Sequence, residues 1–103
     1  MEAEFWNMKK FEAAMSSGET FLVDFFATWC GPCRQMAPTF ERLAKEHPEL
    51  HTAKVDIDVA GDLADLCGVR SVPTFILFSG GKEVARHVGG MPYGALEEFA
   101  GVR

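Results

Sequence analysis

Two cysteines separated by a glycine and a proline stand just after an apolar stretch of the chain. Cys30 and Cys33 follow the apolar run 21–26, and an amphipathic pattern that starts within the motif continues to His47. This order predicts that a buried strand passes into a helix at the two thiols. A helix start carries unpaired N–H groups and a partial positive charge, which favour a thiolate over a thiol. The second thiol, one turn later, is placed to attack a disulfide formed by the first, so the spacing predicts a reversible dithiol–disulfide pair.

We expect different roles for the two sulfurs. Cys30 precedes the helix, so its sulfur is expected to be exposed and to act as the nucleophile. Cys33 lies inside the first turn, so we expect it to be more buried and to act as the resolving thiol. Two alternatives remain at this point, a structural disulfide and half of a zinc site. Zinc takes about four ligands, whereas only Cys67 and three scattered histidines remain, none paired at ligand spacing, so we predict no metal.

Length and composition limit the classes of function. A chain of 103 residues that is 48% hydrophobic predicts one domain over 1–103, and we expect a monomer. The net charge of −5 and the scattered Lys and Arg residues argue against nucleic-acid binding. No apolar stretch approaches the roughly 18 residues of a membrane span. The first six residues lack the basic and apolar regions of a signal peptide, so a cytoplasmic location is expected.

The elements that position the thiols are read from apolar periodicity. The pattern predicts strands at 2–6, 20–26, 51–57, 74–78 and 83–88. It predicts helices that end near Ser17, His47 and Cys67, and a last helix that starts at Pro92. Gly80 and Gly81 suit a tight hairpin turn. Strand–helix alternation followed by a hairpin and a helix predicts an α/β fold, a central mixed sheet with helices on both faces.

Several single residues carry further expectations. Pro38 falls inside the second helical pattern and predicts a kink, because proline removes a backbone donor and clashes with the preceding turn. The following side chains are expected to face the core: Leu63, Leu66, Leu96 and Phe99. Cys67 is expected to be a small core residue. The three histidines are expected to be ordinary surface or core residues.

Asp24 stands in the middle of the apolar run 21–26. Burying an unpaired carboxylate is costly, so a buried aspartate here suggests a chemical role, whereas a position at an exposed strand end would not. We expect burial, and we expect desolvation to raise the pKa of this carboxyl group.

At this point several segments together resemble the thioredoxin family. Val-Asp-Phe-Phe-Ala-Thr-Trp-Cys-Gly-Pro-Cys-Arg at 23–34 is similar to the family's active-site segment. Pro38 stands where thioredoxins carry a kinking proline, and the segments at 53–58, 71–75, 80–82 and 88–89 also resemble the family. The likeness covers nearly the whole chain, from about Phe11 to Phe99. It departs at Phe26, where relatives often have tryptophan or tyrosine, and at the additional Cys67.

The resemblance implies a thioredoxin fold and a protein-disulfide reductase. It implies that Gly31-Pro32 tunes the pair toward reduction, since a histidine in place of Pro32 is typical of oxidants and isomerases. It also implies that Asp24 accepts the proton of Cys33, through water, and that Lys54 pairs with this carboxylate. The expected partners are disulfide-containing protein substrates and a thioredoxin reductase as electron donor. No cofactor is expected beyond the Cys30–Cys33 disulfide itself.

The resemblance further implies a cis peptide bond before Pro73, although X–Pro bonds are mostly trans and the sequence alone would predict trans. The backbone of Val72 would then bind an extended substrate segment as an added strand. Trp29, Val72, Pro73 and Gly89 are expected to form a small apolar groove around Cys30. Two rival functions remain, a disulfide isomerase or oxidase, and a scaffold that uses the same surface to hold a partner protein.

Overall fold

The computed structural model describes residues 3–103, in which strands and helices alternate before a hairpin and a last helix. The strands are β1 (Glu4–Phe5), β2 (Phe21–Phe26), β3 (His51–Asp56), β4 (Thr74–Ser79) and β5 (Lys82–Val88). The helices are α1 (Met8–Ser17), α2 (Gly31–Glu46), α3 (Gly61–Leu66) and α4 (Tyr93–Ala100). These bounds lie close to the predicted ranges; residue 2 of the first predicted strand lies outside the described residues.

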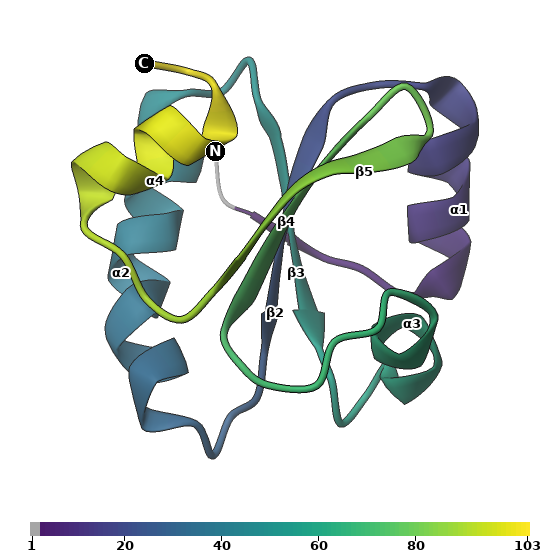
Figure 1. Ribbon diagram of the computed structural model, residues 1–103, viewed down its shortest axis with the longest axis horizontal. Helices are drawn as coiled ribbons and strands as arrows, with labels where there is room; N and C mark the ends of the chain where they lie inside the picture. The colour runs from purple at the N-terminus through teal and green to yellow at the C-terminus, as the bar shows by residue number, and fades with distance from the viewer. Residues whose placement is uncertain (1–2) are drawn as a thin grey trace.

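The strands form one mixed sheet in the order β1-β3-β2-β4-β5. β2 runs parallel to β3 and antiparallel to β4, and β3 is also parallel to β1. The β4–β5 hairpin turns at Gly80 and Gly81, whose φ angles of 64° and 76° are the left-handed values that such a turn requires. Figure 1 shows the sheet between two layers of helices, with α1 and α3 on one face and α2 and α4 on the other. The predicted α/β architecture is confirmed.

Strand β2 lies at the centre of this sheet and is buried on both faces, as its unbroken apolar run predicts. Phe21, Val23 and Phe25 belong to the core beneath α1 and α3. Leu22 belongs to the core beneath α2 and α4. Because side chains alternate along a strand, Asp24 shares the face of Leu22 and is directed toward α2. The central strand therefore sends its single charged side chain toward the helix that carries the dithiol.

Two sequence expectations about helices are wrong. Leu66 is 63% exposed, although Leu63 is fully buried. The core face of α3 lies between Leu63 and Ala64, and at about 100° per residue Leu66 falls roughly 110° away from its centre. Pro92 caps α4 instead of forming its first turn. Leu96 is buried and Phe99 packs against the core, as expected, while the kink at Pro38 stays a prediction.

Among residues 3–103, no helix has both the length and the apolar character needed to cross a bilayer.

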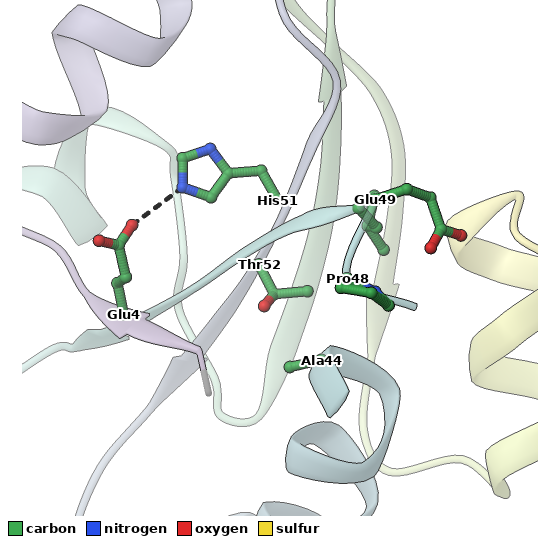
Figure 2. A pocket seen from close by; sticks show the side chains of 7 residues that line it. Glu4, Ala44, Pro48, Glu49, His51 and Thr52 are labelled. Carbon is green, nitrogen blue, oxygen red and sulfur yellow. Dashed lines mark hydrogen bonds and ion pairs between the residues drawn. The ribbon is translucent and has the colours of Figure 1, made fainter. Parts of the chain in front are cut away.

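His51 ties the edge of the sheet together. Its Nε2 lies 2.9 Å from Oε1 of Glu4 on β1, and its Nδ1 lies 2.5 Å from Oε1 of Glu19 in the loop before β2. The indole N–H of Trp6 donates to the same Glu4 oxygen at 3.2 Å. Figure 2 shows Glu4 and His51 joined at the wall of a surface hollow of about 410 Å³. These contacts fasten the two-residue strand β1 to β3, so His51 is more than an ordinary surface residue.

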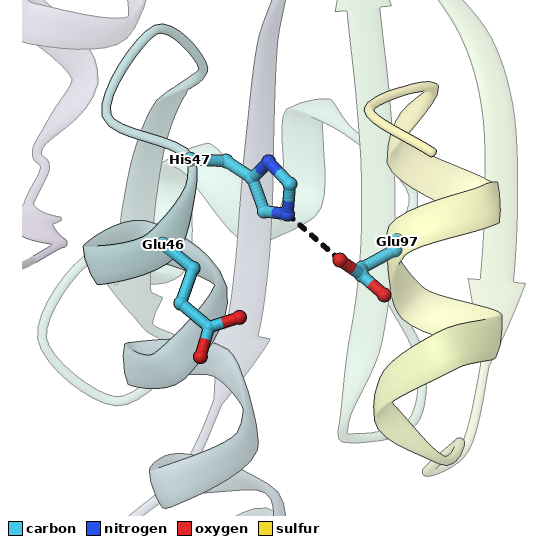
Figure 3. Close-up of side chains that lie close together, drawn as sticks. All are labelled: Glu46, His47 and Glu97. Carbon is cyan, nitrogen blue, oxygen red and sulfur yellow. Dashed lines mark hydrogen bonds and ion pairs between the residues drawn. The ribbon is translucent and has the colours of Figure 1, made fainter.

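His47 similarly links α2 to α4 (Figure 3). Its Nε2 lies 2.8 Å from Oε2 of Glu97, and its Nδ1 lies 3.4 Å from Oε2 of Glu49. Only the imidazolium donates from both ring nitrogens, and the hydrogen bond to Glu97 raises the pKa of His47. Ligand-type atoms of Glu46, His47 and Glu97 lie within 4.8 Å of one another. Glu46, however, already accepts hydrogen bonds from the guanidinium of Arg42 and the hydroxyl of Tyr93, so we describe the cluster as an ion-pair network.

The link through His47 should make stability depend on pH. The imidazolium contribution is complete below the unfolded pKa of about 6.5 and is lost as the pH rises through the higher folded pKa. Replacing His47 with Gln should therefore lower the urea midpoint more at about pH 5.5 than at about pH 9.

The matched control is His87→Gln, because His87 makes no ion pair within residues 3–103. Its effect on the urea midpoint gives the cost of losing an imidazole without an ion pair, against which His47→Gln is compared at each pH. An effect of His47→Gln that does not change with pH would show that the ring acts by packing alone.

Candidate active site

The candidate active site lies between the end of β2 and the start of α2. Cys30 is the N-cap of α2, and its sulfur accepts a hydrogen bond from the backbone N–H of Cys33 at 3.1 Å. Gly31 and Pro32 occupy the first helical turn, where a proline loses no intrahelical hydrogen bond. A donor aimed at the sulfur and the positive end of the helix both stabilise negative charge on Cys30 when the pair is reduced.

Cys30 and Cys33 are joined in a disulfide. Each retains 5% of its accessible surface, so the expectations that Cys30 is exposed and Cys33 more buried are wrong for this form. The two residues differ in the surface pocket that each one lines. Cys30 lines an external groove, whereas Cys33 lines a cavity on the side of Asp24. The geometry therefore gives the two sulfurs different surroundings at equal exposure.

Asp24 lies at the base of the cavity that Cys33 lines, a space of about 200 Å³. The residue is 2% exposed, and its Oδ1 has no hydrogen-bond partner within residues 3–103. Burial raises the pKa of the Asp24 carboxyl from 3.8 to about 7, against the opposing charge of Lys54. The expected burial and pKa direction are confirmed. A carboxyl group with this pKa exchanges a proton readily near neutral pH.

Lys54 is the residue opposite Asp24 on the neighbouring strand β3. The resemblance implied that the two side chains pair, but no ion pair joins them within residues 3–103. The ammonium of Lys54 instead lies 4.8 Å from the ring centroid of Phe26 and 5.6 Å from that of Phe5. These two rings hold the cation at the cavity wall, where its charge lowers the pKa of Asp24 without cancelling the effect of burial.

The groove beside Cys30 has a volume of about 450 Å³. Its lining residues are Trp29, Cys30, Gly31, Pro32, Ile57, Arg70, Ser71 and Val72. Trp29 is 66% exposed, so it is a surface residue as predicted, and its indole N–H donates to Oδ2 of Asp58 at 2.8 Å. This hydrogen bond fixes a large aromatic face beside the reactive sulfur. Such a surface fits an apolar part of another protein.

The peptide bond between Val72 and Pro73 is cis, as the resemblance implied. The carbonyl oxygen of Val72 lies 3.7 Å from Sγ of Cys30, which places this backbone against the dithiol. Pro73 is buried and its carbonyl accepts the N–H of Gly89 at 2.8 Å. Pro73 and Gly89 are absent from the groove lining, so the expected four-residue groove is formed by only Trp29 and Val72 of that set. Gly89 supports the loop with a φ of 100°, a value unfavourable for other residues.

Sequence reasoning missed Ile57, Asp58, Arg70 and Ser71. All four come from the segments that follow β3 and precede β4. Ile57, Arg70 and Ser71 line the groove beside Cys30, and Asp58 accepts the indole N–H of Trp29, contacts that exist only in the folded chain. The one available signal was that Ile57, Asp58 and Ser71 lie within the segments 53–58 and 71–75, which carry the family likeness, and that Arg70 directly precedes the second of them. Cys67 is half-buried against the core of α1 and α3, and burial raises the pKa of its thiol to about 11. This thiol is therefore protonated at neutral pH and is a poor nucleophile.

Comparison with known proteins agrees with this geometry. The sequence model of the thioredoxin family, described as "Thioredoxin", matches residues 2–101. The chain belongs to the thioredoxin family. It is 40% identical to Thioredoxin-1 of Saccharomyces cerevisiae over 100 residues, which cover 97% of each protein.

Solved structures give the same result. The thioredoxin of Plasmodium falciparum superposes with a TM-score of 0.88 at 30% identity, covering 96% of this chain and 97% of that one. The thioredoxin of Fasciola hepatica gives a TM-score of 0.87 at 40% identity, covering 95% and 96%. The family and the Cys30–Cys33 disulfide make this chain a thiol–disulfide oxidoreductase with a protein-disulfide reductase role.

The buried carboxylate of Asp24 should oppose stability at alkaline pH. Between the unfolded pKa of about 3.9 and the folded value of about 7, the native state holds a proton that the unfolded state has lost, so stability falls as the pH rises. Asp24→Asn should therefore stabilise the disulfide form. Its advantage at pH 8 should exceed that at pH 5 by roughly 2–3 kcal/mol, at about 1.4 kcal/mol per pH unit below pH 7. Urea unfolding at both pH values measures the difference.

Asp65→Asn is the control, because Asp65 is an exposed carboxylate on α3. This control should change stability little at either pH. An Asp24→Asn protein that unfolds at lower urea than the parent at pH 8 would contradict the argument from desolvation. In the reduced form, the rate at which the same variant reduces protein disulfides tests whether Asp24 takes the proton of Cys33; that role predicts a slower reaction than in the parent.

Proposed function

We propose that this protein reduces disulfides of other proteins through the Cys30–Cys33 pair and is recharged by a thioredoxin reductase. The observation that supports this most strongly is that Cys30 and Cys33 line two different pockets. Cys30 lines a groove open to a substrate, and Cys33 lines the cavity that holds Asp24. A nucleophile beside a substrate groove and a resolving thiol beside a proton acceptor are what disulfide exchange requires.

In the first step, the Cys30 thiolate attacks one sulfur of a substrate disulfide. A bond forms between Cys30 and that sulfur, the substrate disulfide breaks, and the second substrate sulfur leaves as a thiolate that takes a proton from water. The N–H of Cys33 and the start of α2 stabilise the attacking thiolate. The substrate backbone pairs with Val72, and its apolar side chains contact Trp29.

In the second step, Cys33 resolves the mixed disulfide. Its thiol gives a proton to the carboxylate of Asp24, through water in the shared cavity, and the resulting thiolate attacks Sγ of Cys30. The bond to the substrate breaks, the substrate leaves as a thiolate that is then protonated, and the Cys30–Cys33 disulfide forms. Two electrons have passed from the protein to the substrate, and no cofactor besides the cysteine pair takes part.

Return to the dithiol needs two electrons from a second protein, and we propose a thioredoxin reductase for this step. Gly31 and Pro32 are proposed to keep the pair reducing, and Lys54 to tune the proton affinity of Asp24. We further propose that the protein works as a monomer in the cytoplasm, a compartment in which thiols are kept reduced.

The roles of the two cysteines predict which variant traps substrates. Cys33→Ser should accumulate mixed disulfides through Cys30, because nothing resolves the intermediate. The matched variant Cys30→Ser should accumulate none. Non-reducing electrophoresis followed by peptide mass mapping identifies the trapped sulfur. Trapping by Cys30→Ser in place of Cys33→Ser would reverse the assignment.

Reduction of insulin disulfides tests the catalytic cycle and its electron donor together. One assay contains the protein, NADPH and an NADPH-dependent thioredoxin reductase, and the other contains a ferredoxin-dependent reductase instead. With one of the two donors, the protein should reduce many equivalents of insulin. Omitting the reductase should limit the reaction to one equivalent of reduced protein. Failure to pass one equivalent with both reductases would rule out the proposed recharging step.

A further inference from the structure

Arg70 is the one charged residue among those that line the groove beside Cys30. It is exposed, and within residues 3–103 its side chain makes no ion pair or hydrogen bond. The other four arginines all have acceptors: Arg34 donates to Thr28, Arg42 to Glu46, Arg86 to Glu83, Cys67 and Gly68, and Arg103 to Gly94. Among the arginines of residues 3–103, Arg70 is thus the one whose side chain has no acceptor, and it lies at the proposed substrate site.

The surroundings of Arg70 make this more than a solvated surface charge. The protein carries a net charge of −5, yet the groove lining contains no carboxylate. Asp58, which follows the lining residue Ile57, accepts the indole N–H of Trp29 at 2.8 Å and makes no ion pair with Arg70. A local positive charge on an acidic protein gives a site with its own charge preference.

Arg70 also lies close enough to Sγ of Cys30 to contact a substrate bound there. It precedes Val72 by two residues, and the Val72 carbonyl is 3.7 Å from Sγ of Cys30. Two residues of chain span at most about 7 Å. A substrate segment that pairs with Val72 therefore brings side chains within about three residues of its cysteine into the reach of the guanidinium.

We propose that Arg70 is a specificity-determining residue, which selects protein disulfides whose reacting cysteine has an aspartate or glutamate within about three residues. This inference rests on the proposed function, because it names the substrate class of the same groove. The carboxylate of the substrate supplies the acceptor that Arg70 lacks within the protein, and the planar guanidinium binds it through two N–H groups.

The size of the preference follows from the exposure of the site. Solvent-exposed ion pairs are weak, so an acidic substrate should react about two- to fivefold faster than a neutral one. A lysine at the same position should slow the reaction by a similar factor. At about 1 M salt the Debye length falls to roughly 3 Å, and the preference should disappear.

The test uses the full chain, reduced beforehand, and three disulfide-linked peptides that differ at one position two residues from the cysteine. That position holds Glu, Gln or Lys, and a second set places it on the other side of the cysteine. The single-turnover rate of release of the peptide thiol, measured by chromatography after acid quenching, should follow the order Glu, Gln, Lys in at least one set. The order should collapse at about 1 M salt.

Arg70→Gln should bring the three rates together, and Arg70→Glu should reverse their order. The matched control is Lys45→Gln, which removes one positive charge from the last turn of α2, about 22 Å along the helix from Cys30. This control should keep the order of the parent. If a variant of Arg70 does not fold, the salt dependence of the parent protein still tests the charge preference of the groove, and an order unchanged at about 1 M salt would overturn it.

Equal rates for the three peptides in the parent would overturn the substrate class. An order that survives in Arg70→Gln would overturn the role of Arg70. Both outcomes leave the proposed reductase intact. No reduction of any peptide, together with no reduction of insulin, would overturn the proposed function and this inference with it.

Discussion

The hydrogen bond from the backbone of Cys33 to the sulfur of Cys30 is the contact on which the active site depends. It exists because β2 ends and α2 begins within a few residues, so that a sulfur takes the place of an N-cap oxygen. The sheet holds β2 at its centre, and the core of Met36, Phe40 and Leu43 holds α2 on that sheet. The packing of the whole molecule therefore fixes the direction of the helix start toward the reactive sulfur.

Asp24 is the second constraint on the active site, and its burial lowers the stability of the fold. A carboxylate in the central strand is desolvated, and because its charge is disfavoured there its pKa is raised to about 7. An apolar residue would pack the same position at lower cost. In the proposed mechanism, this loss of stability accompanies a proton acceptor beside Cys33 that gains and loses its proton near neutral pH.

The far ends of the elements are held by other means. His47 joins α2 to α4, and His51 joins the edge strand β1 to β3, each through carboxylates on separate segments. The active-site end, in contrast, leaves Trp29 exposed and Arg70 without a partner within the described residues. The links through His47 and His51 thus involve none of the residues that line the groove beside Cys30.

The order of the elements, the dithiol at the strand–helix junction and the burial of Asp24 could be predicted from the sequence, because these depend on local apolar spacing and neighbouring residue types. It mispredicted Leu66, since a short helix shows too few residues to define its core face. The contacts of Trp29 with Asp58 and of His47 with Glu97, and the place of Arg70 in the groove, could be seen only in the folded chain. Partners separated by 29 or 50 residues leave no periodic pattern, and meet only because the sheet order places their segments side by side.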